Sequence, residues 1–215
     1  MCTGRVDLAF IIRAFKNGMD GVFIGGCWPG ECHYLTEGNY LAFSTVNICK
    51  KLLEYTGINP GRLRIEWMSA AEGSRFAGLM NDFSKRLKLM GPITGDTDGY
   101  EARFETVNKL IPYIKLVERE RFRLPVKSEK AYDDFYKSEE FERLFRELIL
   151  DRLCLTEITD LLREKPRSSE EIAEVMGISP YEVSKYMNSA SGYGLIDYID
   201  QHYTIAMNVC SQRQK

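Results

Sequence analysis

The chain has 215 residues, a formal net charge of -2 and 44% hydrophobic residues, a globular composition with room for two modest domains. Lysine plus arginine (29) nearly equals aspartate plus glutamate (31), so no overall positive charge favours nucleic acid or an anionic membrane. No apolar run reaches the length of a membrane span, and the first residues lack a signal-peptide core. We therefore expect a cytoplasmic protein that does not enter the membrane.

The first 91 residues alternate between helical and strand-like patterns. The predicted elements, in chain order, are helix Asp7–Asn17, strand Gly21–Gly25, helix Asn39–Tyr55, strand Leu63–Trp67 and helix Ser74–Leu89. This order predicts an α/β fold with an incomplete parallel sheet flanked by helices. The apolar run Gly21–Gly25 is typical of a strand in a sheet interior. Because two strands do not make a stable sheet, we expect a further strand from upstream sequence or another subunit.

Residues 92–150 are predicted to be a linker followed by connecting helices. Gly91–Gly99 is rich in glycine, proline and aspartate, as linkers are. Two apolar helical faces follow, one formed by Phe104, Val107, Leu110, Ile111, Ile114 and Leu116, the other by Phe141, Leu144, Phe145, Leu148 and Ile149.

Residues 151–215 are predicted to form a winged-helix domain with a tail. After a helix near Leu155–Arg163, the capping boxes Ser168–Glu171 and Ser179–Glu182 each open a short helix. Two short strands, Leu195–Ile199 and Tyr203–Ile205, then flank a turn at Asp200–His202. Helix, helix, turn, helix and hairpin is the order of a winged helix.

Three cysteines mark the candidate site. Cys27 follows the first predicted strand, and Cys2 precedes the first helix, where it would end a neighbouring strand. Ligands of parallel sheets bind at the carboxyl ends of strands, so both thiols are expected to face one spot. Pro29 and Gly30 supply turns that fold Cys32 back toward them. Thiolates are the ligands that iron–sulfur clusters prefer, and the fourth ligand is expected from outside this chain.

The other candidate ligands have simpler interpretations. Cys49 lies on an apolar helical stripe and is predicted to be a packed core thiol, although buried free cysteine is also the alternative for the three site thiols. His33 is a possible ligand, but a lone loop histidine is more often structural. Cys154 lies on an apolar helix face and Cys210 in the polar tail, and neither has another cysteine near it in the sequence.

The segments Cys2–Asp7 and Gly25–Tyr34, read as C-T-G-R-V-D and G-G-C-W-P-G-E-C-H-Y, closely resemble the delta subunit of methyl-viologen-reducing hydrogenase, over roughly residues 1–90. The resemblance implies a non-catalytic subunit with a 2Fe–2S cluster. It also implies electron transfer between a hydrogenase or formate dehydrogenase and the flavoprotein subunit of heterodisulfide reductase. The family begins with a further strand and cysteines that precede the C-T-G-R motif, and these are absent here. The resemblance does not extend to residues 100–215.

Two alternatives remain open. A redox-responsive winged-helix transcription regulator would use the cysteines as sensor, but residues 151–215 hold seven basic against ten acidic residues, which disfavours DNA binding. A thiol enzyme would use Cys27 or Cys32 as nucleophile, with His33 as the nearby base.

In the electron-transfer interpretation, two features are candidate contacts to partner subunits. They are the incomplete sheet and the aromatic side chains Tyr181, Tyr186 and Tyr193.

Overall fold

The computed structural model describes residues 2–93, 100–199 and 202–206, and the chain divides into two compact units, one ending at Phe145 and one beginning at Arg146. Residues 94–99 of the predicted linker, two residues of the predicted hairpin turn (200 and 201) and Cys210 lie outside the described residues. No helix among the described residues is long and apolar enough to span a membrane.

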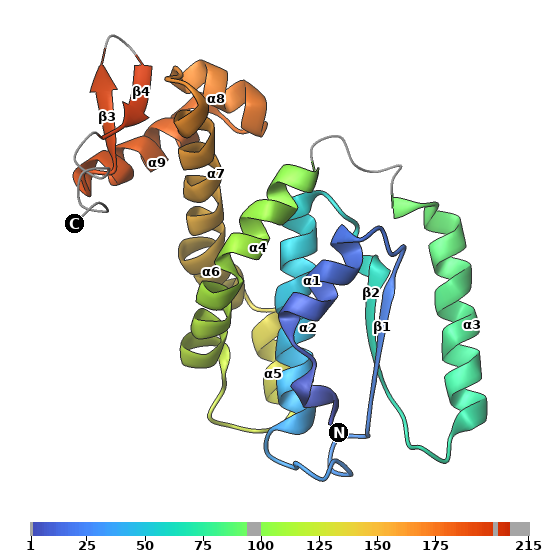
Figure 1. Cartoon of the computed structure of the whole chain (residues 1–215). Helices are drawn as coiled ribbons and strands as arrows, with labels where there is room; N and C mark the ends of the chain where they lie inside the picture. Colours follow the sequence, from blue (N-terminus) through green and yellow to red (C-terminus); the bar gives the residue numbers. More distant parts are fainter. Residues whose placement is uncertain (1, 94–99, 200–201, 207–215) are drawn as a thin grey trace, which may run out of the picture. The chain divides into compact units, whose positions relative to one another are not determined.

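A two-stranded parallel sheet lies between helices in the first unit (Figure 1). Its elements in chain order are the 3-10 helix η1 (Thr3–Arg5), α1 (Leu8–Lys16), β1 (Val22–Gly26), α2 (Gly38–Thr56), the 3-10 helix η2 (Pro60–Arg62), β2 (Leu63–Trp67) and α3 (Gly73–Met90). Helices α1 and α2 contact the sheet on one side. On the other side, the ring of Phe23 packs 5.8 Å from that of Phe83 in α3. The predicted order of helices and strands is confirmed.

Strand β1 has a single neighbouring strand among the described residues. It pairs in parallel with β2 in the register Ile24 to Ile65, as expected for consecutive strands joined by a helix. The sheet has only these two strands among the described residues, so β1 is an edge strand. An apolar run between glycines indicates burial on its faces and does not reveal how many neighbours the strand has, so a place in the sheet interior, which needs the further strand expected from outside this chain, stays a prediction. Of its five residues, only Ile24 and Gly26 are buried.

The remaining helices of the first unit pack around an aromatic core. They are α4 (Tyr100–Val117), the π-helix η4 (Glu118–Phe122), α5 (Glu129–Tyr136) and α6 (Glu139–Phe145). Phe141 is 1% exposed, and its ring lies 4.7 Å from that of Tyr136. Leu116, expected on the apolar face, is exposed while Val117 is buried. Leu116 comes two residues after the buried Ile114 and so points away from its face, whereas Val117 comes three residues after Ile114 and shares that face.

The described part of the second unit contains three main helices and two paired strands. Its elements are the π-helix η5 (Arg146–Leu150), α7 (Asp151–Glu164), α8 (Ser169–Met176), α9 (Pro180–Gly192), β3 (Ile196–Ile199) and β4 (His202–Ile205). Both predicted capping boxes are present, with reciprocal hydrogen bonds at Ser168 and at Ser179. Gly177 ends α8 in the left-handed conformation, with φ of 68°. The predicted helices and antiparallel hairpin are confirmed, and the winged-helix assignment itself stays a prediction.

Candidate thiol site

Two of the three predicted thiols face each other. The Sγ atoms of Cys2 and Cys32 are 3.6 Å apart, although the residues are separated by 30 positions in the chain. Cys2 directly precedes η1, and the backbone N–H of Gly4 donates to its sulfur over 3.4 Å. Cys32 comes from the loop between β1 and α2, where Gly30 turns the chain with φ of 89°. The turn residues Pro29 and Gly30 predict that this loop folds back, and it brings Cys32 to Cys2.

Gly38, the first residue of α2, leaves the space that the thiols occupy. A Cβ atom at this position would lie 2.4 Å from the Cys32 sulfur and 2.7 Å from the Cys2 sulfur, distances that real Cβ atoms essentially never show. A Cβ on Gly4 would in turn lie 2.5 Å from the carbonyl oxygen of Gly38. The two glycines therefore allow the start of α2 to approach η1 closely. The partial positive charge at the N-terminus of α2 favours negative charge on the two sulfurs.

Cys27 differs from this pair in its exposure and in its contacts. It follows the last residue of β1, it is exposed, and it lines a cavity of about 330 Å³ together with Gly25, Met68 and Phe76. Its backbone carbonyl accepts a hydrogen bond of 2.6 Å from the side chain of Asn39, the second residue of α2. The structure thus brings Cys2 and Cys32 together, while Cys27 lies at the carboxyl end of its strand as the topology predicts.

The cysteine loop is anchored to the start of α3 by residues that sequence reasoning missed. The indole N–H of Trp28 donates to the Glu72 carboxylate over 2.7 Å, and the backbone N–H of Ser69 donates to the same carboxylate over 2.7 Å. These bonds lower the pKa of Glu72. The guanidinium of Arg75 lies 4.7 Å from the centre of the Trp28 ring. No local pattern pairs Trp28 with a residue 44 positions away, so the sequence alone gives little signal for this anchor.

The thiols differ in how burial affects them. Burial raises the pKa of the Cys32 thiol, and negative charge on Cys2 or Cys27 would raise it further. Cys49 is fully buried in α2, which raises the pKa of its thiol far above the ordinary value. Its prediction as a packed core thiol is confirmed. His33 is exposed, and its ring packs against Tyr34.

The donor set suits soft metals, but it is incomplete within the described residues. Among those residues no three His, Cys, Asp or Glu side chains are grouped closely enough to hold a metal ion. The site fits part of an iron–sulfur ligand set. It has two adjacent sulfurs, a glycine that leaves space beside them, and a backbone N–H that donates to one of the sulfurs. Cys27 is the third available thiol, and no fourth is present at this end of the described sheet.

A short parallel sheet with thiols at its carboxyl end defines the first unit as a cysteine-bearing α/β domain. Residues 1–91 match the model of the family "Methyl-viologen-reducing hydrogenase, delta subunit". An F420-non-reducing hydrogenase vhu iron-sulfur subunit of Methanopyrus kandleri is 40% identical over 92 residues, which cover 69% of that protein and 43% of this chain. The chain belongs to this delta-subunit family.

Two further relatives show the range of proteins that carry this segment. The F420-non-reducing hydrogenase vhc iron-sulfur subunit of Methanococcus voltae is 49% identical over 94 residues, 44% of this chain and 65% of the relative. A ferredoxin/F420H2-dependent CoB-CoM heterodisulfide reductase subunit of Methanosarcina acetivorans is 45% identical over 93 residues, 43% of this chain and 12% of that longer protein. The match therefore spans just under two thirds of the Methanococcus voltae protein and a small part of the reductase protein.

Proposed function

We propose that the chain is an electron-transfer subunit that holds a 2Fe–2S cluster through Cys2, Cys27 and Cys32, with the fourth ligand supplied from outside this chain. It passes electrons between a hydrogenase or formate dehydrogenase and the flavoprotein subunit of heterodisulfide reductase. The observation that carries the proposal is the facing pair Cys2 and Cys32 in the space left by Gly38. The names of the relatives, which are hydrogenase and heterodisulfide reductase subunits, support it and do not favour the transcription-regulator alternative.

The residues of the chain have separate tasks in this function. Cys2 and Cys32 supply adjacent thiolates, and the Gly4 N–H bonded to the Cys2 sulfur stabilises negative charge there. Trp28, held by Glu72, ties the start of the loop to the start of α3, and Asn39, bonded to the Cys27 carbonyl, ties it to α2. A bound 2Fe–2S cluster supplies one-electron redox chemistry at this place.

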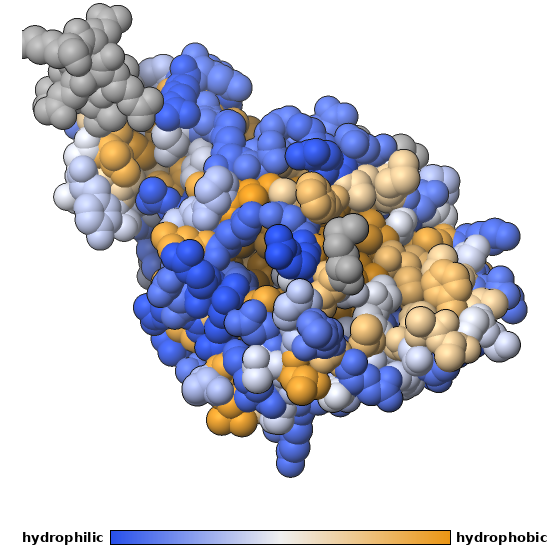
Figure 2. Space-filling model, turned by 60° about the horizontal axis from the view of Figure 1, so that its bottom comes forward, coloured by the Kyte–Doolittle hydropathy of each residue, from blue (hydrophilic) through white to orange (hydrophobic). Residues whose placement is uncertain are grey.

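A partner has an apolar surface to contact beside Cys27. In Figure 2 the molecule is turned so that the carboxyl ends of β1 and β2 come toward the viewer. In this view, apolar side chains gather on the side of α3. Phe76 of α3 lines the cavity of Cys27 and is 49% exposed. An exposed apolar surface next to a redox site suits docking of another subunit, because the contact excludes water and shortens the path for the electron.

Metal analysis tests the cluster directly. The complex that contains this protein, purified without oxygen, is expected to hold iron and acid-labile sulfide assigned to this chain, with a charge-transfer absorption that reduction bleaches. Stoichiometric zinc without iron would refute the redox function and leave a structural metal site.

Cysteine variants test the ligand assignment. Cys27→Ser and Cys32→Ser are each expected to remove iron from this chain and to stop electron flow from dehydrogenase to flavoprotein, while the partners keep their own activities with artificial dyes. Cys49→Ala is the matched control, because this thiol is fully buried in α2 and is expected to leave iron content unchanged. Full coupled electron transfer in both serine variants would show that these thiols are not ligands of a required cluster.

A further inference from the structure

A second cavity of the first unit, with a volume of about 540 Å³, lies between the start of the chain and the end of α4. One wall runs from Gly4 in η1 to Leu8, the first residue of α1. A second is α2 at Leu41 and Thr45, and the third is the segment from Pro112 to Arg123. The first two walls belong to the segment that matches the delta-subunit family, and the third lies beyond its end at residue 91. The family match therefore does not account for this cavity.

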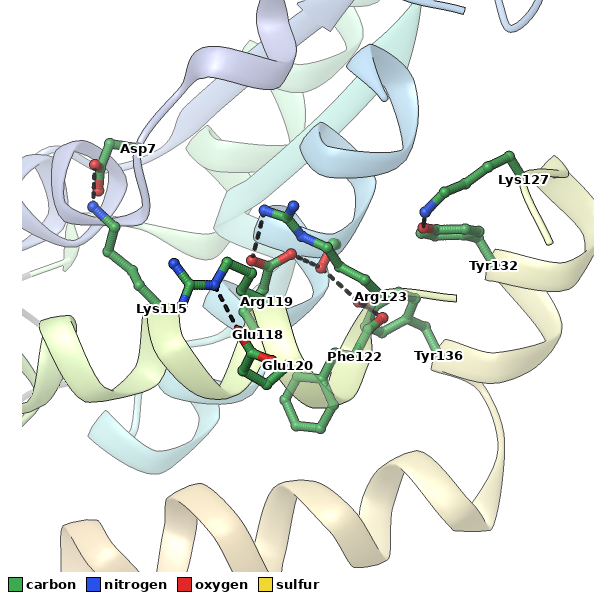
Figure 3. Close-up of polar contacts among 11 residues, drawn as sticks. Asp7, Lys115, Glu118, Arg119, Glu120, Phe122, Arg123, Lys127, Tyr132 and Tyr136 are labelled. Atoms are coloured by element: carbon green, nitrogen blue, oxygen red, sulfur yellow. Dashed lines mark hydrogen bonds and ion pairs between the residues drawn. The ribbon is translucent and has the colours of Figure 1, made fainter. Parts of the chain in front are cut away.

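The cavity carries more positive than negative charge. Four of its lining side chains are cationic, namely Arg5, Lys115, Arg119 and Arg123, and two are acidic, Asp7 and Glu118. Both acids are already paired within the lining, as Figure 3 shows. Lys115 donates to Asp7 over 2.5 Å, and Arg123 lies 3.5 Å from a carboxylate oxygen of Glu118. Two positive charges remain without a counter-charge in the lining.

The surplus charges are on Arg5 and Arg119. The Arg5 guanidinium has no hydrogen-bond or ion-pair partner in the part of the chain that the structure describes. Arg119 pairs with its neighbour Glu120, which does not line the cavity, and both side chains are more than half exposed. Such an exposed pair contributes little free energy, so the Arg119 guanidinium can turn to a bound anion at small cost.

Each of the two acids also accepts a second hydrogen bond. The other Asp7 carboxylate oxygen caps α1 by accepting the Ala9 N–H over 2.9 Å. Glu118 accepts the Ser44 hydroxyl over 3.0 Å, and Ser44 in turn accepts the buried Tyr136 hydroxyl over 2.6 Å (Figure 3). Because each carboxylate is bonded from two sides, neither is free to neutralise Arg5 or Arg119.

We propose that this cavity binds a small organic anion with a phosphate or carboxylate group and a compact apolar body. Guanidinium groups match both oxyanions through two parallel hydrogen bonds. The side chains of Val6, Leu41 and Leu116 supply apolar lining for the rest of the molecule, and the volume falls within the range of small-molecule sites. The site is independent of the proposed cluster, although Gly4 lines it and donates its N–H to the Cys2 sulfur.

Calorimetric titration of the full-length chain with phenyl phosphate and with benzoate, at constant ionic strength, tests the proposal. At least one of the two probes is expected to bind saturably, and the tighter one shows whether phosphate or carboxylate is preferred. The double variant Arg5→Gln/Arg119→Gln is expected to weaken that binding by about tenfold or more, as the loss of charge-assisted hydrogen bonds does. Arg86→Gln on α3, an exposed arginine that is paired with Asp82 and does not line the cavity, is the control for loss of a single surface charge and should bind as the unchanged chain does.

A second variant tests the cavity rather than the charge. Thr45→Tyr places a ring in the cavity from α2, retains every cation, and is expected to abolish saturable binding. Circular dichroism verifies that each variant is folded. Absence of saturable binding of both probes to the unchanged chain at millimolar concentration would overturn the proposal. Binding that survives both the double variant and Thr45→Tyr, or that falls equally in Arg86→Gln, would overturn it as well.

Discussion

The helix starts of the second unit are fixed by contacts of shorter range than the thiol site and the aromatic core of the first. In the second unit, the start of each of α8 and α9 is fixed by a capping box that joins residues three positions apart. In the first unit, the contacts that shape the thiol site and the aromatic core join distant positions, such as Cys2 with Cys32 and Tyr136 with Ser44, 92 residues away. A substitution at one of these long-range contacts in the first unit is therefore expected to affect the whole unit, and a capping substitution in the second to affect one helix.

Removal of a ring from the aromatic core should have the largest effect. Phe141→Ala is expected to lower the free energy of unfolding of the first unit by about 3–5 kcal/mol, because a buried ring in contact with several others leaves a cavity. Both tryptophans, Trp28 and Trp67, lie in this unit, so urea unfolding followed by tryptophan fluorescence reports on it alone. Leu89→Ala, at a side chain 89% exposed, is the control and should change little. Equal effects of the two variants would contradict the cooperative core.

A methyl group at Gly38 should have the next largest effect. Gly38→Ala is expected to cost about 1–3 kcal/mol in the same fluorescence assay, since the new Cβ would overlap both sulfurs. The control is Gly78→Ala in α3, where nothing lies within 4 Å of the new Cβ. It is expected to stabilise the unit by about 0.5–1 kcal/mol, because alanine is the better helix former. A neutral Gly38→Ala would mean that the thiols do not need this space.

The difference in range also explains what the sequence could predict. The capping boxes at Ser168 and Ser179 and the glycine stop at Gly177 are local signals, and the structure has each of them at the predicted residue. Strand β2 and the buried stripe of α2 that holds Cys49 were also predictable, because hydrophobic periodicity is local too. These patterns need no knowledge of the tertiary structure.

The thiol site was predictable in its residue types and only partly in its geometry. The topology placed Cys27 at the end of β1, but it gave no means to see that Cys32 meets Cys2 while Cys27 stays exposed. The role of Gly38 was missed as well, because a glycine at a helix start has many local explanations and its contact with two sulfurs appears only in three dimensions. The exposure of β1 at a sheet edge depends on which strands are present, which no pattern within the strand encodes.

A cap substitution in the second unit should have a smaller, local effect. Ser168→Ala removes the hydroxyl that accepts the Glu171 N–H and is expected to cost about 1 kcal/mol. Hydrogen exchange of the backbone amides should show the loss of protection in α8 and leave the tryptophan-monitored unfolding of the first unit unchanged. Ser169→Ala, one residue further along, keeps the cap and is the control. Loss of protection throughout the second unit would contradict a local effect.

The smallest expected effect is a change in the titration of Glu182. The Ser179 hydroxyl and backbone N–H hydrogen-bond to this carboxylate and lower its pKa below the ordinary value. A lowered pKa in the folded state means that the stabilisation is present at neutral pH and is lost as the pH falls from about 4.5 through the folded pKa. Carbon-13 NMR of the glutamate carboxyl groups should therefore give Glu182 a midpoint below 4.5.

Ser179→Ala separates the two hydrogen bonds to this carboxylate. The variant removes the hydroxyl, the larger cause of the lowered pKa, and keeps the backbone N–H, so the Glu182 midpoint should rise toward the ordinary value without reaching it. The midpoint of Glu171, which belongs to the other capping box, should stay where it is, because its own backbone bond from Ser168 is intact. A shift of both midpoints together would show that the two capping boxes are coupled, and the contrast between a locally fixed second unit and a cooperatively packed first unit would then fail.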